Sequence, residues 1–457
     1  MGNLISTERE KTRCAVFVPV IRNSYRANAE DGEQSDSASN NKRPPQAQLE
    51  EACGLAEAID LDVVLTDISS VATFKPATLY GGGKVDDLFH ALKMNDVQVT
   101  LVDHPLTPVQ QRNLERAWQT KVLDRTGIIL EIFGARAQTK EGRLQVDLAA
   151  LRYQRGRLVR SWTHLERQRG GAGFLGGPGE TQIESDRREL QMKIERLERQ
   201  LEEVRRTRSL HRKQRKRREI PIIAFVGYTN AGKSTLFNKM TKANVLAKDL
   251  LFATLDPTLR RIELPQGTVA VMSDTVGFIS NLPTDLVAAF RSTLEEVTEA
   301  DVIVHVRDIS HEDTHVQADD VVGVLEDLGL DIKDIDGLSQ AGTHYLEVWN
   351  KADLLDQNRR NEMDSLIAAR EYPPVCVTSA VTGEGIDDLL VHLEACLNAG
   401  QKTQTVTLKD AAIAKMHFAY ELGTVLDRQN TDEGHVILKV RSNRWSELSH
   451  HLDLQAQ

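Results

Sequence analysis

The chain has 457 residues, of which 40% are hydrophobic, so it is long enough for roughly three packed domains. Its four cysteines show no metal-ligand spacing, which indicates a reducing compartment and no disulfide framework. We expect no membrane span and no secretion signal, because no apolar stretch is long enough for either. The net charge of −10 does not suggest a general affinity for nucleic acids, but this average hides a local basic segment.

Residues 1–137 are predicted to form an N-terminal α/β domain, with a polar and flexible loop at 22–46. Apolar runs alternate with helical patterns, which favours a parallel sheet. The expected strands are 12–21, 62–65 and 97–102, and the expected helices are 48–59, 85–93 and 108–118. The glycines before Lys84 could hold a phosphate, although a tight turn is the simpler interpretation.

Residues 138–219 are predicted to form an antiparallel helical hairpin. Two apolar seams with steps of three and four residues flank a Gly-rich break at 170–180. The break is longer than a turn requires, so we interpret it as a flexible probe on a stiff arm rather than a simple connector. The arm ends in a basic segment, Arg205–Arg218, which contains nine cationic residues and no acid. This segment is either a phosphate-binding patch or a solvated helix face.

Residues 220–400 have the pattern of a doubly wound, mainly parallel sheet. Four further strands are expected at 269–272, 302–306, 345–349 and 375–378, with helices at about 285–298, 313–328, 358–370 and 385–398. Residues 401–457 are predicted to form a small α+β domain with strands at 403–408 and 435–441 and a helix at about 409–426.

A phosphate-binding loop follows the first strand of the 220–400 domain. It has the spacing G-x-x-x-x-G-K-S and comprises Gly227, Tyr228, Thr229, Asn230, Ala231, Gly232, Lys233, Ser234 and Thr235. The glycines allow backbone N–H groups to surround an anion, and Lys233 would reach the outer phosphates. The Ser234 hydroxyl is a candidate Mg²⁺ ligand. A chance Gly-rich turn is the alternative, but the flanking strand and helix argue against it.

Three later strands also end in motifs of a guanine nucleotide site. The first motif is Asp274, Thr275, Val276 and Gly277, in which the carboxylate would hold Mg²⁺ through water and the Gly277 N–H would sense the terminal phosphate. The second is Asn350, Lys351, Ala352 and Asp353, whose last carboxylate would accept two hydrogen bonds from guanine. The third, Ser379, Ala380 and Val381, would cover the base. Four motifs in this order predict a GTPase.

The first switch is expected between the phosphate loop and the next strand. Its candidate nucleotide contacts are Phe252, Ala253, Thr254, Leu255 and Asp256. On spacing alone, either Thr254 or Thr258 could close over Mg²⁺. The candidate catalytic residues are Lys233, Gly277 and whichever of these two threonines closes over Mg²⁺.

Phe278 occupies the position at which Ras-like enzymes place a glutamine that orients the attacking water. A phenyl ring cannot orient water, so we predict slow intrinsic hydrolysis that depends on external help. Asn230 suggests one source of help, a K⁺ ion held between its side chain and the phosphates.

The chain resembles the HflX family, a group of ribosome-associated GTPases related to the Obg group. The resemblance is carried by the motifs above and by further stretches outside them: Leu251–Arg260, Asn281–Ala289, Leu123–Phe133, Arg160–Gly171 and Gly177–Arg188. It is weak after about residue 400 and absent from 22–46. The run Gly-Pro-Gly-Glu-Thr-Gln at 177–182 is more specific than any GTPase motif.

The resemblance implies a cytoplasmic bacterial GTPase that binds the large ribosomal subunit and ribosomal RNA and splits stalled or idle ribosomes under stress. It implies that Thr254 is the Mg²⁺ threonine and so completes the catalytic set of Lys233, Thr254 and Gly277. It also implies that the arm tip contacts the ribosome, with Gly173, Gly177, Pro178 and Gly179 as candidate residues. Some relatives carry an arginine before this Gly-Pro, and its absence here weakens the case for a basic RNA contact. We expect a monomer when free.

Two alternatives remain open at the level of sequence. A subunit-assembly or RNA-binding factor would need the same nucleotide switch without splitting ribosomes. An ATP-using RNA remodeller would need a second nucleotide near Gly81–Lys84, while Asn350 and Asp353 argue against ATP in the main site.

Overall fold

The computed structural model describes fourteen stretches of the chain. They are residues 11–21, 43–168, 178–216, 220–242, 251–255, 258–280, 294, 296–330, 332, 343–368, 375–399, 401–431, 434–442 and 445–452. No helix within these stretches has the length and apolar character that crossing a bilayer requires.

The N-terminal domain is a four-stranded sheet of order β2-β1-β3-β4 in which all strands are parallel. Its elements are β1 (Arg13–Ile21), α1 (Pro45–Glu57), β2 (Asp62–Val71), α2 (Gly82–Met94), β3 (Val99–Val102), α3 (Pro108–Trp118), β4 (Lys121–Asp124) and α4 (Arg125–Arg136). The predicted parallel α/β unit is confirmed. We did not predict β4 and α4 as elements. Lys84, in the first turn of α2, forms an ion pair with Asp67 at 3.0 Å.

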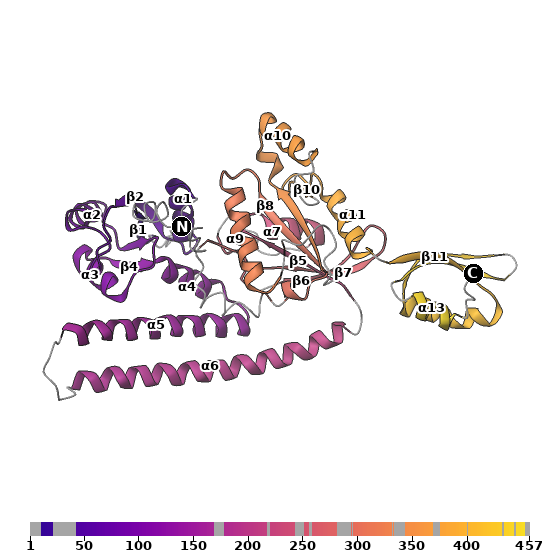
Figure 1. The fold of residues 1–457 in the computed structure, drawn as a ribbon, viewed down its shortest axis with the longest axis horizontal. Helices are drawn as coiled ribbons and strands as arrows, with labels where there is room; N and C mark the ends of the chain where they lie inside the picture. Colours follow the sequence, from indigo (N-terminus) through magenta and orange to yellow (C-terminus); the bar gives the residue numbers. More distant parts are fainter. Residues whose placement is uncertain are drawn as a thin grey trace, which may run out of the picture.

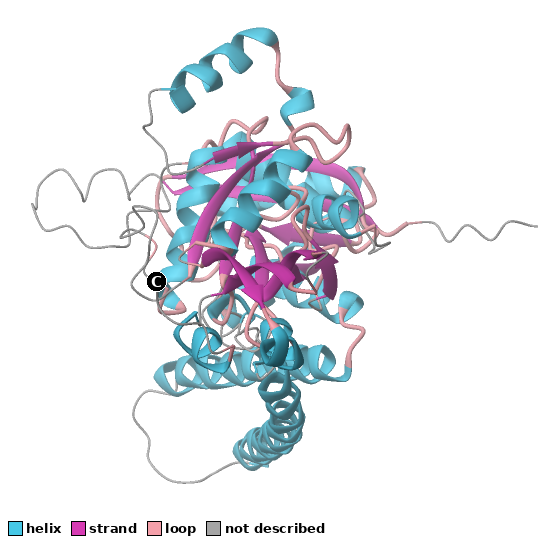
Figure 2. Ribbon diagram, turned by 90° about the vertical axis from the view of Figure 1, so that its right-hand side faces the viewer, coloured by secondary structure: helices cyan, strands magenta, loops and turns pink. Residues whose placement is uncertain are grey.

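The hairpin consists of α5 (Lys140–Gln168) and α6 (Pro178–Lys216), which lie side by side along the N-terminal and central domains (Figure 1). Turned by 90°, the long helices lie below the strands (Figure 2). Leu144 and Leu148 of α5 are buried against Ile194 and Leu201 of α6, as the seams predict. Helix α6 already begins at Pro178, so the predicted break at 170–180 extends too far; proline suits a first helical position, where its missing N–H costs nothing.

The central domain is a six-stranded sheet of order β10-β9-β8-β5-β7-β6. Its elements are β5 (Ile222–Gly227), α7 (Lys233–Thr241), β6 (Thr258–Glu263), β7 (Val269–Asp274), β8 (Val302–Asp308), α9 (Thr314–Asp327), β9 (His344–Asn350), η3 (Ala352–Leu354), α10 (Gln357–Ala368), β10 (Val375–Val377) and α11 (Ile386–Leu397). Only β6 is antiparallel to its neighbour, and it was not predicted. Most of the predicted helix at 285–298 lies outside the described residues.

The C-terminal domain is an antiparallel sheet of order β11-β13-β12. Its elements are β11 (Lys402–Leu408), η4 (Asp410–Lys415), α12 (His417–Glu421), β12 (Thr424–Asn430), β13 (Val436–Ser442) and α13 (Trp445–His451). The predicted helix at 409–426 is therefore confirmed only in part: the chain is helical over Asp410–Lys415 and His417–Glu421 as two short helices, and from Thr424 it is a strand. Gly423 explains the break: a Cβ there would lie 2.8 Å from the Arg441 carbonyl oxygen, so the chain approaches β13 closely at the point where strand pairing begins.

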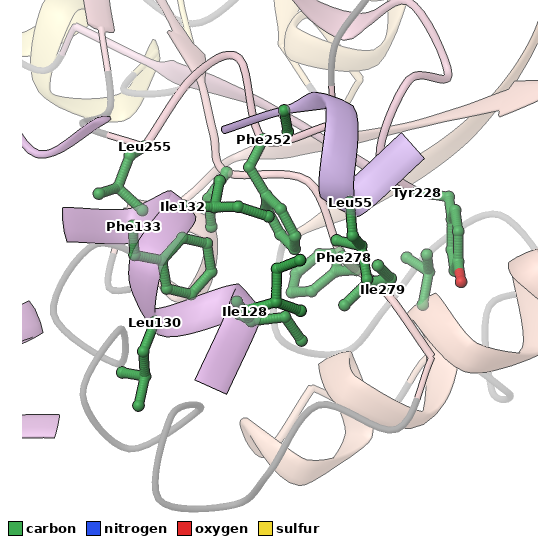
Figure 3. Packing of buried hydrophobic residues seen from close by; sticks show 14 of the residues in the cluster. Leu55, Ile128, Leu130, Ile132, Phe133, Tyr228, Phe252, Leu255, Phe278 and Ile279 are labelled. Atoms are coloured by element: carbon green, nitrogen blue, oxygen red, sulfur yellow. The ribbon is translucent and has the colours of Figure 1, made fainter. Parts of the chain in front are cut away.

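The N-terminal and central domains share one hydrophobic core (Figure 3). Leu55 of α1 and Ile128, Ile132 and Phe133 of α4 are buried together with Phe252, Leu255, Phe278 and Ile279 of the central domain. The Phe133 and Phe252 rings meet edge to face with 4.7 Å between their centroids. The expected first switch, which contains Phe252 and Leu255, is thus packed against a different domain, and so is the segment 277–280, which we call the second switch.

Candidate functional site

The phosphate loop forms a tight turn between β5 and α7, and both of its glycines are required. Gly227 has a φ of 150°, and a Cβ there would lie 2.2 Å from the Val306 carbonyl oxygen of β8. Gly232 has a φ of 91°, and a Cβ there would lie 2.2 Å from the Asn350 Nδ2 atom. Any side chain at either position would break the loop or displace a neighbouring strand end.

Lys233 is buried at the bottom of this loop, with 6% of its surface exposed. Its Nζ donates to the carbonyl oxygens of Gly227 at 3.0 Å and Tyr228 at 2.7 Å. Burial lowers the pKa of Lys233 to about 8, and nearby Asp274 only partly opposes this shift. A buried ammonium with neutral partners is suited to bind an anion.

Three oxygen-bearing side chains gather beside the lysine. The Ser234 hydroxyl donates to Asp274 Oδ2 at 2.6 Å, and its oxygen lies 2.8 Å from Thr254 Oγ1. Burial raises the pKa of Asp274, although the Ser234 hydrogen bond and the Lys233 charge favour its ionised form. Among the described atoms, the buried Asp274 Oδ1 has no hydrogen-bond partner.

This donor set fits a magnesium ion, since hard oxygen ligands and an unpartnered buried carboxylate oxygen are what Mg²⁺ requires. Thr254 is the switch threonine in position to take part. Thr258, the alternative on spacing, begins β6 and lies opposite Asp274 in the strand pair. The geometry therefore favours Thr254.

A hollow of about 410 Å³, open to solvent, extends over the loop. It is lined by Thr229, Asn230, Gly232, Lys233, Ser234, Thr235, Phe252, Ala253, Thr254, Thr275 and Gly277. Gly277 closes one side: a Cβ there would lie 2.9 Å from the Thr229 Cα atom and 3.1 Å from the Lys233 Nζ. A glycine lets this backbone come directly against the anion site.

The predicted base-recognition motifs meet at the ends of β9 and β10. Asn350 donates from Nδ2 to the Ala231 carbonyl at 2.9 Å and accepts from the Ala380 N–H at 3.0 Å. It therefore braces the phosphate loop against the 379–381 segment. Asp353 is exposed, and its Oδ1 accepts from the Ser379 hydroxyl at 2.6 Å. Val381 next to this pair is 72% exposed.

Several predicted contact residues turn their side chains away from the hollow. Tyr228, Leu255 and Val276 are buried in the core shared with the N-terminal domain, as is Phe278, so they can meet a nucleotide only through their backbones. Lys351 pairs with Asp308 at 2.7 Å. Asp256, Gly173 and Gly177 lie outside the described residues, and of Pro178 and Gly179 only the helical backbone is described.

The sequence did not predict that the N-terminal domain would contribute polar groups to this region. Arg43, Glu51 of α1 and Arg125 of α4 reach Tyr228 and Ser280 next to the hollow. Arg125 lies in the stretch Leu123–Phe133 that carries the resemblance, but no nucleotide-site motif marks any of the three side chains, because their partners lie up to 270 residues away in the chain.

Models of four protein families match consecutive parts of the chain. They are described as GTP-binding GTPase N-terminal (residues 46–134), GTP-binding GTPase middle region (136–215), 50S ribosome-binding GTPase (222–350) and HflX C-terminal domain (366–455). A GTPase HflX of Magnetococcus marinus is 48% identical over 365 residues, which cover 79% of this chain and 81% of that protein.

The chain belongs to the HflX family of GTPases. It is a GTP-hydrolysing enzyme. The GTPase HflX of Escherichia coli is 43% identical over 367 residues, covering 80% of this HflX family member and 83% of the relative. A solved GTP-binding protein of Sulfolobus solfataricus in complex with GDP is 21% identical with a TM-score of 0.43, covering 85% of this chain and 99% of that one.

Proposed function

We propose that this HflX family member binds the large ribosomal subunit and splits stalled or idle ribosomes under stress, and that GTP hydrolysis accompanies its release. The observation that carries the proposal is the joining of a nucleotide switch to a stiff two-helix arm. Helix α6 alone has 39 residues, a length of about 58 Å. Such an arm can place a short tip far from the nucleotide, inside a site too narrow for a domain.

Within the nucleotide site, we propose that Gly227–Thr235 surround the phosphates and that Asp353 reads guanine, with Asn350 bracing the two regions together. Ser234, Thr254 and Asp274 would hold Mg²⁺, which supplies positive charge to the phosphate oxygens when bound. Asn230, which is exposed at the hollow with a φ of 61°, would hold K⁺. Equal hydrolysis rates in Na⁺ and K⁺ buffers would remove the K⁺ assignment.

The arm tip, including Gly173, Gly177, Pro178 and Gly179, and the basic segment Arg205–Arg218 would contact ribosomal RNA. We propose a cytoplasmic, ribosome-associated protein that is a monomer when free. A large-subunit assembly factor without splitting activity is the second candidate, because it would use the same switch and the same arm.

The decisive experiment measures GTP hydrolysis by the full chain in K⁺ buffer, with and without purified large subunits. The buried Phe278 provides no water-orienting group, so we expect slow turnover alone and a large stimulation by the subunits. Sedimentation of joined ribosomes with the protein and a non-hydrolysable GTP analogue separates the two candidates. Free subunits support splitting, whereas intact joined ribosomes would support the assembly role.

A further inference from the structure

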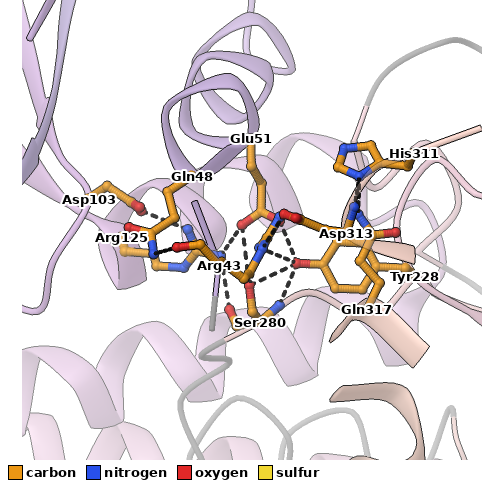
Figure 4. Close-up of polar contacts among 10 residues, drawn as sticks. All are labelled: Arg43, Gln48, Glu51, Asp103, Arg125, Tyr228, Ser280, His311, Asp313 and Gln317. Carbon is orange, nitrogen blue, oxygen red and sulfur yellow. Dashed lines mark hydrogen bonds and ion pairs between the residues drawn. The ribbon is translucent and has the colours of Figure 1, made fainter. Parts of the chain in front are cut away.

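Ser280, three residues after Gly277, is held at every polar atom (Figure 4). Its N–H donates to the Tyr228 hydroxyl at 2.9 Å. Its carbonyl oxygen accepts from Arg125 Nη2 at 2.9 Å, and its Oγ accepts from Arg43 Nη1 at 2.6 Å. The second switch therefore cannot shift at this residue without breaking several buried hydrogen bonds.

The groups that hold Ser280 come largely from the N-terminal domain. Glu51 forms ion pairs with Arg125 at 2.5 Å and with Arg43 at 2.8 Å, and it accepts a hydrogen bond from the Tyr228 hydroxyl. Burial alone would raise the pKa of Glu51, but the two arginines hold it below its usual range, so the carboxylate stays ionised. All three charged side chains are about 7% exposed or less. Removing Arg125 would leave Glu51 paired with Arg43 alone and would take from the nearly buried Asp103 the arginine with which it pairs at 2.6 Å.

Asp124, the residue before Arg125, contacts helix α5 of the arm. Asp124 caps α4 by accepting from the Gly127 N–H at 2.8 Å. The same carboxylate accepts from the Tyr153 hydroxyl at 2.7 Å and pairs with Arg157 Nη1 at 3.3 Å, and both partners belong to α5. Because Asp124 and Arg125 are consecutive at the start of one helix, neither can move far without the other.

We propose that the first turn of α4 couples the second switch to the arm, with Arg125 as a positioning residue for GTP hydrolysis and Asp124 as its counterpart on α5. A rearrangement at Gly277–Ser280 pulls on Arg125, turns α4 and shifts α5 through Asp124. The apolar half of the same helix reinforces the coupling, since Ile132 and Phe133 pack against Phe252 of the first switch (Figure 3). The inference rests on the GTPase activity and not on ribosome splitting.

The test compares amide hydrogen exchange in α5, residues 140–157, between the GDP-bound full chain and the chain with a non-hydrolysable GTP analogue. We expect the wild type to show a nucleotide-dependent difference and Arg125→Gln to lose it. Single-turnover hydrolysis by Arg125→Gln should fall about tenfold or more, while GDP affinity stays within about twofold. A slower hydrolysis rate with unchanged GDP affinity distinguishes a positioning role from general destabilisation, which would weaken GDP binding as well.

A double variant, Tyr153→Phe with Arg157→Gln, removes the contacts between α5 and Asp124. It tests the proposal independently if Arg125→Gln does not fold. It leaves the switch contacts in place, so basal hydrolysis should remain while the nucleotide-dependent exchange difference disappears. Arg136→Gln is the matched control, because this arginine lies in the last turn of α4 and donates to the Ala58 carbonyl at 3.0 Å, within the N-terminal domain. It should behave as the wild type.

Two results would overturn the proposal. One is a wild type whose α5 exchange does not depend on the nucleotide. The other is a folded Arg125→Gln, or a folded double variant, that keeps the full difference.

Discussion

At the scale of the residue, the proposed recognition of guanine rests on one exposed carboxylate. Asp353 accepts from Ser379 at 2.6 Å, which orients it at the edge of the site. Asp353→Asn replaces an acceptor with a donor where guanine also donates. We expect GTP affinity to fall roughly 10- to 100-fold and xanthosine triphosphate to become the better ligand. Competition binding with both nucleotides measures the change, and unaltered base preference would refute the assignment.

Lys233 gives a prediction for pH. Its pKa is lowered to about 8 by burial in the free protein, whereas a bound phosphate favours the charged form and raises it. Nucleotide binding should therefore take up about half a proton at pH 8 and much less at pH 6.5. Affinity should decline as pH rises through 8, because the free lysine is then neutral.

Calorimetry of GDP binding in buffers of different ionisation enthalpy measures the proton uptake by Lys233. Magnesium is omitted so that Asp274, whose pKa is raised by burial, does not release a proton. Binding without proton uptake at pH 8 would show that the ammonium is not the phosphate ligand.

At the scale of the element, the helical hairpin holds the arm tip at a distance from the nucleotide site, so the tip can be removed without changing that site. The described part of the seam lies at the base of the arm, where Leu148 packs against Ile194 and Leu201 and Arg155 donates to Gln191 at 2.6 Å. Deleting Gly171–Gly179 removes the tip and leaves this packing intact. GTP affinity should stay unchanged while ribosome splitting falls to background, as sedimentation would show. Splitting at the wild-type rate would reduce the tip to a connector.

At the scale of the whole molecule, the charge is uneven: the net value is −10, yet nine cations lie within Arg205–Arg218. If six or more of them contact phosphates, affinity for large subunits should fall about 10³-fold or more between 50 and 200 mM salt. Each cation changed to alanine should reduce the slope of log affinity against log salt by about one. Association that is insensitive to salt would assign the segment to a solvated helix face.

The sequence by itself determined those features whose cause is local in the chain. The phosphate loop needs Gly227 and Gly232 because no other residue fits their backbone, and the hairpin seam repeats every three or four residues. The 409–426 segment shows where such reasoning fails: the helical part ends at Glu421, and the predicted continuation to residue 426 is lost because pairing with β13 stabilises Thr424–Asn430 as a strand. Strand β6 was not predicted either, because it too is stabilised by pairing with another strand, β7.

Only the tertiary structure decided which distant groups meet at the switches. Glu51 and Tyr228 are separated by 177 residues, and nothing in either local sequence indicates that they form a hydrogen bond. By spacing alone, Thr254 and Thr258 were equally good candidates for the Mg²⁺ ligand. In the structure, Thr258 belongs to β6 and pairs with β7, which leaves Thr254 as the favoured residue. The sequence encodes such contacts only through the packing of whole domains, because an ion pair or a buried ring leaves no periodic pattern along the chain.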